Sequence, residues 1–453
     1  MRKLSSPPGT RPDWLVQFGR RLLLARGRAG LTQQALGAPD LSKSFISLLE
    51  SGRSHPSVET VMALARRVNT SMGALLLGPD ELRRETALSL VHLAGLLDLA
   101  AHGREVGTLL DAARALWPDP PGDLRLRDLL LRARAALAAQ ALTEAARCSD
   151  EAIALARRQR LIHLQGMAQA VRGEVEVRRG AWAAALPLLE AGTTAMQRGK
   201  AARTEENIRA LLLLGTTRAH LGQLERAQRA YRRAVELATR LRLHGLRGRA
   251  LAAQALLHRH RRRLDAALEA LGAARAALEQ AQATDELSRV LTQIGLVQSE
   301  QGRFQDALGT LGEALRLQER GTSPRDRSVT MAEIAAVHLA MGHAGEASRA
   351  ARRALKEAQS VRDPASTATA QVALARALRA QGRRTDAIDL LRDAVAALGK
   401  TGRTRQMAGA ASELGALLRE AGEAGEAARY AAMAGATARA QAVPGVVLDQ
   451  LPR

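Results

Sequence analysis

LGTTRAHLGQLERAQRAYRRAVEL, residues 214–237, spaces its small residues evenly among leucines and arginines: Gly215, Gly222, Ala227 and Ala234. Ala, Leu and Arg are all good helix formers, so the stretch predicts helical structure on both sides of a turn. Gly222 permits that tight turn. Small residues where two antiparallel helices cross let their backbones approach closely. The stretch therefore predicts a helical hairpin.

The same spacing recurs along most of the chain. Ala227 is followed at 40-residue intervals by Ala267, Ala307, Ala347, Ala387 and Ala427. The glycine of the turn recurs at Gly302, Gly342, Gly382 and Gly422, with Arg262 as the one exception. The last small residue recurs at Ala274, Ala314, Ala354, Ala394 and Ala434. Upstream, Gly173, Gly180, Ala185 and Gly192 give the same unit two residues out of phase. A weaker copy lies around Ala145 and Ala152, and a degenerate one lies around 85–116.

A single hairpin of this kind cannot bury its apolar face, whereas stacked neighbours can, so the repetition predicts an α-solenoid. A coiled coil is the alternative, but it would need a sustained seven-residue repeat that these helices lack. The spacing of small residues resembles the tetratricopeptide repeat, here with a 40-residue period. The resemblance covers residues 80–440.

The first 79 residues do not show this repeat. The whole chain is expected to be all-α, with a domain boundary at Gly78-Pro79. Helices are expected from Trp14, over 33–37, over 42–51, from Pro56-Ser57 to Val68 and over 71–77, with Asp13, Thr32 and Ser42 as N-caps. The expected domains are a disordered tail over 1–12, a small bundle over 13–79, the solenoid over 80–441 and a C-terminal tail over 442–453.

The charge is strongly positive, at +22 for 453 residues. Residues 1–79 hold 11 basic and 4 acidic residues, a net charge of +7, so the charge is densest at the N-terminus. Such a bias suggests an anionic partner, with nucleic acid the leading candidate. Only five of the 67 basic residues are lysine, and this arginine excess also fits a high-GC genome.

Several functional classes find no support. No apolar run approaches the roughly 18 residues of a membrane span, and the N-terminus lacks an apolar signal core, so a cytoplasmic protein with no membrane association is expected. The single cysteine, Cys148, excludes an internal disulfide and is expected to be a buried structural thiol. No phosphate-binding glycine loop or nucleophile–base constellation is present, so we expect neither an enzyme nor a cofactor or metal site.

The segment SKSFIS, residues 42–47, crowds three serines and a lysine into the first turn of a short expected helix. A short helix, a turn and a second helix whose N-terminus presents small polar groups suit reading of the DNA major groove. The helix dipole adds partial positive charge at Ser42, facing the anionic duplex.

Residues 19–76 resemble the Cro/repressor class of helix-turn-helix domains. The matching elements are Thr32-Gln33, Leu41-Ser42, Ile46-Ser47, Leu49-Glu50, Gly52 and Pro56. The resemblance implies base contacts for Lys43, Ser44 and Ser47, phosphate contacts for Gln33, Ser42 and Arg53, and core positions for Phe45, Ile46 and Leu49. The alternatives are helix caps or solvated positions for the serines, and a surface position for Lys43. Thr32 to Ser42 is one residue shorter than usual, and Gly37 replaces the usual Ala, which implies a tightened turn.

Three arginines occupy one position of successive first helices: Arg209, Arg249 and Arg289. By analogy with the repeat family, this position lines the concave groove. A ladder of guanidinium groups could hold an acidic peptide or its C-terminal carboxylate. The alternative is that these arginines are simply solvated.

The combination favours a sequence-specific DNA-binding transcriptional regulator. We expect it to be a homodimer on double-stranded DNA, cytoplasmic and nucleoid-associated when bound, with an array that senses a peptide or protein effector. A scaffold whose array is the main functional part is the alternative. The combination also resembles peptide-pheromone-sensing regulators of Gram-positive bacteria. Those clamp a peptide with several asparagines, whereas this array has only Asn207.

Overall fold

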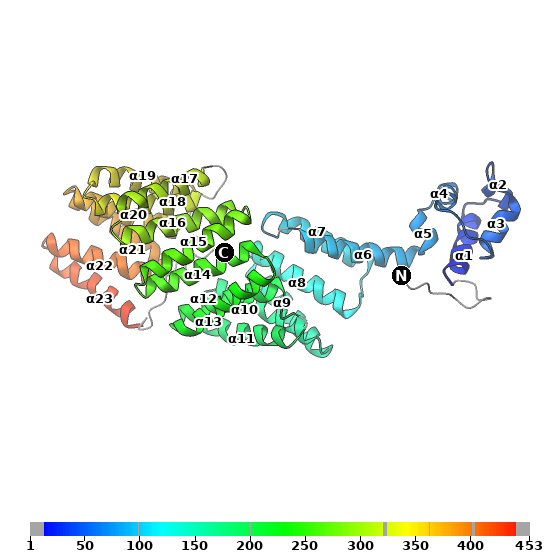
Figure 1. The fold of residues 1–453 in the computed structure, drawn as a ribbon, viewed down its shortest axis with the longest axis horizontal. Coiled ribbons are helices and arrows are strands. Elements are labelled where there is room, and N and C mark those ends of the chain that lie inside the picture. Colours follow the sequence, from blue (N-terminus) through cyan, green and yellow to red (C-terminus); the bar gives the residue numbers. More distant parts are fainter. Residues whose placement is uncertain are drawn as a thin grey trace. The chain divides into compact units, whose positions relative to one another are not determined.

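The computed structural model describes residues 13–440 except 98, 200, 320–323, 362 and 401–403. All regular elements in these residues are helices, which confirms the all-α fold (Figure 1). The chain divides into two compact units, residues 1–160 and 161–453. The expected tails, 1–12 and 442–453, lie outside the described residues. None of the described helices is long and apolar enough to cross a membrane.

The first unit begins with a bundle of five short helices: α1 (Asp13–Arg28), α2 (Gln33–Gly37), α3 (Lys43–Glu50), α4 (Val58–Arg67) and α5 (Met72–Leu76). Two hairpins follow it, built from α6 (Pro79–Leu96), α7 (Leu99–Leu116), α8 (Gly122–Ala138) and α9 (Leu142–Arg158). The bundle core consists of large side chains, and Phe18, Leu22 and Leu64 are fully buried in it. Burial of each such side chain stabilises the bundle by about 1.5–3 kcal/mol.

The caps of the bundle confirm the expected helix starts. The Thr32 hydroxyl accepts from the Ala35 amide at 3.1 Å, and the Ser42 hydroxyl accepts from the Phe45 amide at 3.1 Å. Ser57 and Ser71 cap α4 and α5 in the same way. Asp13 differs, since it is the first residue of α1 and not the residue before it. Each side-chain cap satisfies an amide that has no partner within its helix.

Two residues shape the short turn between α2 and α3. A Cβ on Gly37 would lie 3.3 Å from Cγ1 of Ile46, so a residue larger than glycine would be crowded there. Arg67 of α4 donates to the carbonyl oxygens of Leu36 and Gly37 at 3.0 and 3.1 Å. Arg67 thereby satisfies carbonyl groups at the end of α2.

The second unit is an array of helical hairpins. They pair α10 (Ile162–Arg178) with α11 (Trp182–Arg198), α12 (Glu205–His220) with α13 (Leu224–Arg240), α14 (His244–His260) with α15 (Leu264–Gln280), α16 (Thr284–Glu300) with α17 (Phe304–Gln318), α18 (Pro324–Ala340) with α19 (Ala344–Ser360), α20 (Pro364–Ala380) with α21 (Arg384–Lys400), and α22 (Thr404–Glu420) with α23 (Ala424–Ala440). We call the earlier helix of each pair the first helix. Most of these helices have 17 residues and are joined by three-residue turns, which accounts for the 40-residue period.

The repeated glycines close the turns within the hairpins. Gly222 has a φ of 74°, a left-handed conformation that glycine adopts without steric cost, and Gly302, Gly342, Gly382 and Gly422 have the same sign of φ. The exception noted in the sequence, Arg262, takes the same conformation with a φ of 57°. The turn geometry is therefore a property of the repeat, and glycine is the residue that fits it best.

The small residues in the helices lie at the crossing points. A Cβ on Gly215 of α12 would come within 2.4 Å of the Tyr231 ring of α13, and one on Gly295 would come within 2.6 Å of Leu311. Ala227 and Ala234 of α13 are fully buried. Both observations confirm close backbone approach within each hairpin.

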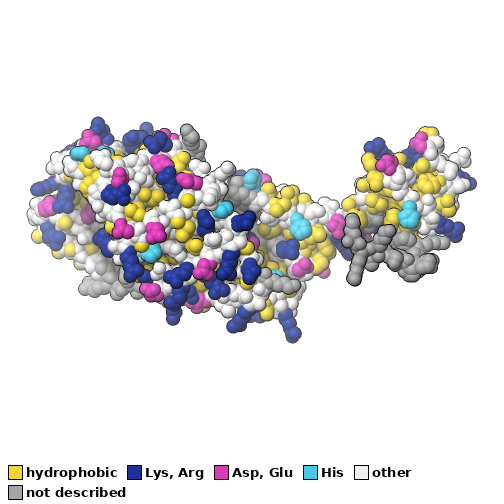
Figure 2. Space-filling model, viewed as in Figure 1, with side chains coloured by type: hydrophobic (Ala, Val, Ile, Leu, Met, Phe, Trp, Pro, Cys, Tyr) yellow, Lys and Arg dark blue, Asp and Glu magenta, His cyan; other side chains and the backbone are white. Residues whose placement is uncertain are grey.

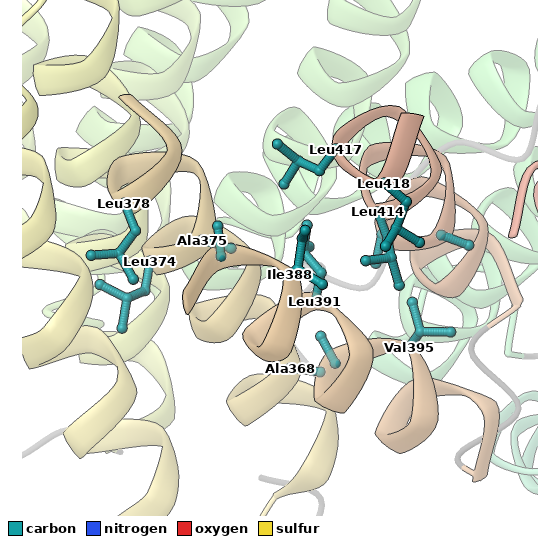
Figure 3. Close-up of a cluster of buried hydrophobic side chains, with 14 of the residues drawn as sticks. Ala368, Leu374, Ala375, Leu378, Ile388, Leu391, Val395, Leu414, Leu417 and Leu418 are labelled. Carbon is teal, nitrogen blue, oxygen red and sulfur yellow. The ribbon is translucent and has the colours of Figure 1, made fainter. Parts of the chain in front are cut away.

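The core of the array passes from one hairpin to the next. Figure 3 shows Leu374 and Leu378 of α20, Ile388 and Leu391 of α21 and Leu414 of α22 within one buried cluster. A hairpin therefore buries its apolar side chains against its neighbours, as the solenoid expectation required.

The first helices define one side of the array. Consecutive first helices from α10 to α20 contact each other, while consecutive second helices make no comparable contact in the described part of the chain. The side on which neighbouring helices are closest is the inner side of a superhelix. We call this side, formed by the first helices, the inner face.

Candidate nucleic-acid interface and effector site

One face of α3 points to solvent while the opposite face is buried. Ile46 and Leu49 are fully buried, which confirms their expected core positions, whereas Phe45 is only partly buried. Lys43, Ser44 and Ser47 are exposed and share a face, since residues three and four apart are neighbours on a helix. We call these three residues the reading face.

The side chains of the reading face are free to bind. In the part of the chain that the structure describes, Lys43, Ser44 and Ser47 make no side-chain hydrogen bond or ion pair. Arg53, just beyond the end of α3, is likewise exposed. Ser42 is exposed too, but its hydroxyl caps α3. The face thus offers an ammonium group and two hydroxyls in the first half of α3, and a guanidinium lies beyond the end of the helix.

Gln33 is placed differently from these residues. Its Nε2 donates to Oε2 of Glu50 at 2.8 Å, so one amide hydrogen points toward the end of α3. Glu50 also accepts from Nε of Arg26 at 2.6 Å, and the Glu50 side chain is only 3% exposed. This hydrogen bond raises the pKa of Arg26. The Arg26–Glu50 pair ties α1 to α3 and holds the side chain of Gln33.

Sequence reasoning missed the contact between Arg26 and Glu50, because the two residues are 24 positions apart and neither helix pattern links them. The available signal was that Glu50 is the one acidic residue of α3 and follows the buried Leu49. Gly19 of α1 reveals the same close approach, since a Cβ there would lie 2.4 Å from the carbonyl oxygen of Leu49.

The three arginines of the array form a row on the first helices α12, α14 and α16. We call Arg209, Arg249 and Arg289 the arginine row. The Arg209 side chain is 58% exposed and pairs with Glu205 on its own helix. Arg249 is less exposed, and its nearest carboxylate, Glu286, lies 3.9 Å away. Burial lowers the pKa of Arg249, and so do the charges of Arg209 and Arg289, while Glu286 opposes the shift.

Arg289 completes the row. Within the described residues it makes no ion pair shorter than 4.0 Å, and its Nε is buried without a hydrogen-bond partner. Negative charge already lies near the row, because Glu205 pairs with Arg209, Glu286 lies near Arg249, and Arg289 opposes the rise in the pKa of Asp326 that burial causes. On the face visible in Figure 2, basic side chains are interspersed with acidic ones.

Other candidate groups are structural. Cys148 is buried, as expected, and burial raises the pKa of its thiol to about 12. Within the described residues, no group of three or more His, Cys, Asp or Glu side chains is arranged to hold a metal ion.

Comparison with known families separates the chain into its two parts. A helix-turn-helix domain family matches residues 17–76, and tetratricopeptide repeat families match residues 208–240 and 326–400. The chain is a helix-turn-helix protein with a tetratricopeptide repeat array. Both resemblances drawn from the sequence are confirmed. The matched families are those of DNA-binding and repeat domains. No curated protein sequence matches the chain.

Solved structures share the fold at low sequence identity. The apo form of RapI is 13% identical with a TM-score of 0.59, covering 81% of this chain and 99% of its own. The apo form of the quorum sensor NprR from B. thuringiensis is 14% identical with a TM-score of 0.58, covering 78% of this chain and 97% of its own. A Rap protein complexed with competence and sporulation factor is 16% identical with a TM-score of 0.52, covering 75% and 99% respectively. At these identities the likeness concerns the fold.

Proposed function

We propose that the protein is a sequence-specific DNA-binding transcriptional regulator whose repeat array responds to an effector. The observation that carries this proposal is the reading face of α3, because its exposed polar side chains have no partner in the described part of the chain. In helix-turn-helix domains this helix enters the major groove, where hydroxyl and ammonium groups distinguish base edges.

Phosphate contacts accompany base reading. We assign Arg53, Ser42 and Gln33 to phosphates on the two sides of α3. Gln33 keeps its amide oxygen and one amide hydrogen after donating to Glu50, and Glu50 fixes its orientation. The net charge of +7 on residues 1–79 supplies the attraction that brings the domain to DNA.

We assign residues 13–79 to DNA binding and 80–441 to the repeat array. The regulator would act as a homodimer, because domains of this type read paired half-sites about one helical turn apart. It would act in the cytoplasm, on the nucleoid, and without catalysis of its own.

The arginine row supports an anionic effector for the array. The nearest carboxylate to Arg249, that of Glu286, is 3.9 Å away, and the charges of Arg209 and Arg289 lower the pKa of Arg249, so an incoming carboxylate would favour its charged form. Peptide binding is described for proteins of the same fold. One such structure is the Rap conjugation gene regulator of plasmid pLS20 in complex with the Phr* peptide, 14% identical with a TM-score of 0.51.

Selection of bound duplexes from a random DNA library, using the full-length protein, tests the proposal. We expect the retained duplexes to share a motif of two half-sites, with affinity that falls steeply as salt is added. Light scattering of the same sample should give the mass of a dimer. If no motif is enriched while the protein is folded, the scaffold alternative replaces the regulator. A monomer at micromolar concentration would contradict the paired half-sites.

A further inference from the structure

A cavity of about 280 Å³ lies between the two hairpins of the first unit. Residues of α6, α7, α8 and α9 line it, together with the connection between α7 and α8. Small-molecule sites usually measure roughly 300–1,000 Å³. The cavity is close to the lower limit of that range, so it suits a compound with one or two rings. None of its lining residues belongs to the reading face or to the arginine row.

The connection between α7 and α8 forms one wall of the cavity. It has five residues, 117–121, and three of them are prolines, whereas most turns of the array have three residues. Proline fixes its backbone φ and has no amide hydrogen to donate, so this connection continues neither helix. Its residues Trp117, Pro118 and Pro120 line the cavity with rings.

The helices supply an apolar lining opposite these rings. Val91 of α6, Ala113 of α7 and Leu124 of α8 all line the cavity, and each is buried. The guanidinium carbon of Arg84 on α6 lies 5.6 Å from the centre of the Trp117 ring, a distance at which a cation attracts an aromatic ring. This contact holds the indole in place. The cavity therefore offers apolar surfaces against which a flat, apolar body can pack.

Four charged side chains also line the cavity, and three of them already have partners. Arg114 donates to Asp128 at 2.8 Å, and Glu151 pairs with Arg147. The fourth, Arg125 of α8, is exposed, and within the described residues its side chain makes no hydrogen bond and no ion pair shorter than 4.0 Å. The one charge of the lining that is left for a ligand is therefore positive.

We propose that this cavity binds a small aromatic carboxylate, with its ring between Trp117 and Leu124 and its carboxylate at Arg125. A guanidinium group binds a carboxylate through two parallel hydrogen bonds. A cationic ligand would find both carboxylates of the lining already paired, and a neutral ligand would leave Arg125 without a partner. The site is separate from the arginine row and adds a second ligand to the protein.

Ligand-observed NMR titrations of the full-length protein test the proposal with three probes of similar shape: indole-3-acetate, indole-3-acetamide and tryptamine. The acetate is an anion, the acetamide is neutral and tryptamine is a cation. We expect the acetate to bind about tenfold more tightly than the acetamide, which corresponds to a difference of about 1.4 kcal/mol. Tryptamine should bind no more tightly than the acetamide.

Two variants assign the two ends of the ligand, and a third is the control. Arg125→Gln should reduce the affinity for the acetate to that for the acetamide, and it removes an exposed side chain on which no contact of the fold depends. Trp117→Ala should weaken both compounds alike and so preserve their ratio. Arg104→Gln, at an exposed position of α7 outside the lining, should behave as wild type. Circular dichroism confirms that each variant is folded.

Several results would overturn the proposal: equal affinities for the acetate and the acetamide, tightest binding of tryptamine, or no binding of any probe at millimolar concentration. A preference for the acetate that survives Arg125→Gln would do so too, because the carboxylate would then bind elsewhere, as at the arginine row. The selection of DNA is a separate measurement, and neither result decides the other.

Discussion

The reading face of α3 and the side chains of Arg249 and Arg289 all lack hydrogen-bond partners within the described residues, but their surroundings are opposite. Lys43, Ser44 and Ser47 are exposed, whereas Arg249 and Arg289 are partly buried. Exposed groups act through water, where single contacts are weak and many must add up, as on a DNA duplex. Partly buried charges interact more strongly and suit one small ion. The difference suits the proposed binding of a polymer at one site and of a small ligand at the other.

The two sites also rest on different cores. The reading face is held by large side chains and by the Arg26–Glu50 pair, in which the carboxylate is buried. The arginine row stands on hairpins whose helices meet through Gly and Ala. A substitution in the core beneath α3 should therefore destabilise the bundle by breaking an ion pair. A substitution in the core beneath the arginine row should destabilise its hairpin by overpacking.

The largest effect is expected from Arg26→Ala. The substitution leaves Glu50 as a buried charge held by Gln33 alone, and breaking a buried pair on one side costs about 3 kcal/mol or more. Hydrogen exchange of the full-length protein should show α3 losing protection while the array keeps its own. Arg20→Ala, exposed on the same helix, is the matched control. Unchanged protection of α3 would mean that the pair does not hold this helix.

Overpacking should follow in size. Gly215→Ala places a Cβ against the buried Tyr231 ring and should destabilise the hairpin by about 1–3 kcal/mol. Gly272→Ala, in a helix where no atom lies within 4 Å of the new Cβ, should stabilise by about 0.5–1 kcal/mol. Hydrogen-exchange rates of the backbone amides in α12 and α15 measure these two changes in stability. If both substitutions changed stability in the same direction, the explanation that Gly215 lies at a helix crossing point and Gly272 does not would be contradicted.

A smaller effect is expected for Arg53→Ala on DNA binding. Loss of one phosphate contact should cost about 1.5 kcal/mol on every sequence alike and reduce the salt slope of the binding constant by about 1. Arg249→Ala, in the array, should leave that slope unchanged. The comparison is made by DNA titrations at several salt concentrations. If the loss of affinity in Arg53→Ala depended on the DNA sequence, Arg53 would contact a base and not a phosphate.

The smallest effect concerns the exceptional turn. Arg262→Gly should stabilise its hairpin by about 0.5–1 kcal/mol, because the left-handed conformation strains any residue with a Cβ. Glycine offsets part of this gain through its greater freedom in the unfolded chain. Gly302→Arg should change stability in the opposite direction. Denaturant unfolding of the two variants checks both signs.

Local features of the sequence predicted much of this structure. Ser42 and Thr32 cap their helices as expected, and the glycines of the turns adopt the left-handed conformation, because each depends on residues a few positions away. The Arg26–Glu50 contact was not predicted, since it depends on helices brought together by the fold. The arginine row was visible because the repeat itself aligns its members.

The central claim is that the exposed face of α3 reads bases. Its most direct test is the motif selected from random duplex DNA by Ser44→Ala, compared with that of the wild-type protein. We predict that the motif persists but loses preference at one or two positions in each half-site, by about 1–3 kcal/mol there. A variant that selects the wild-type motif unchanged, or that weakens equally on all sequences, would contradict the claim.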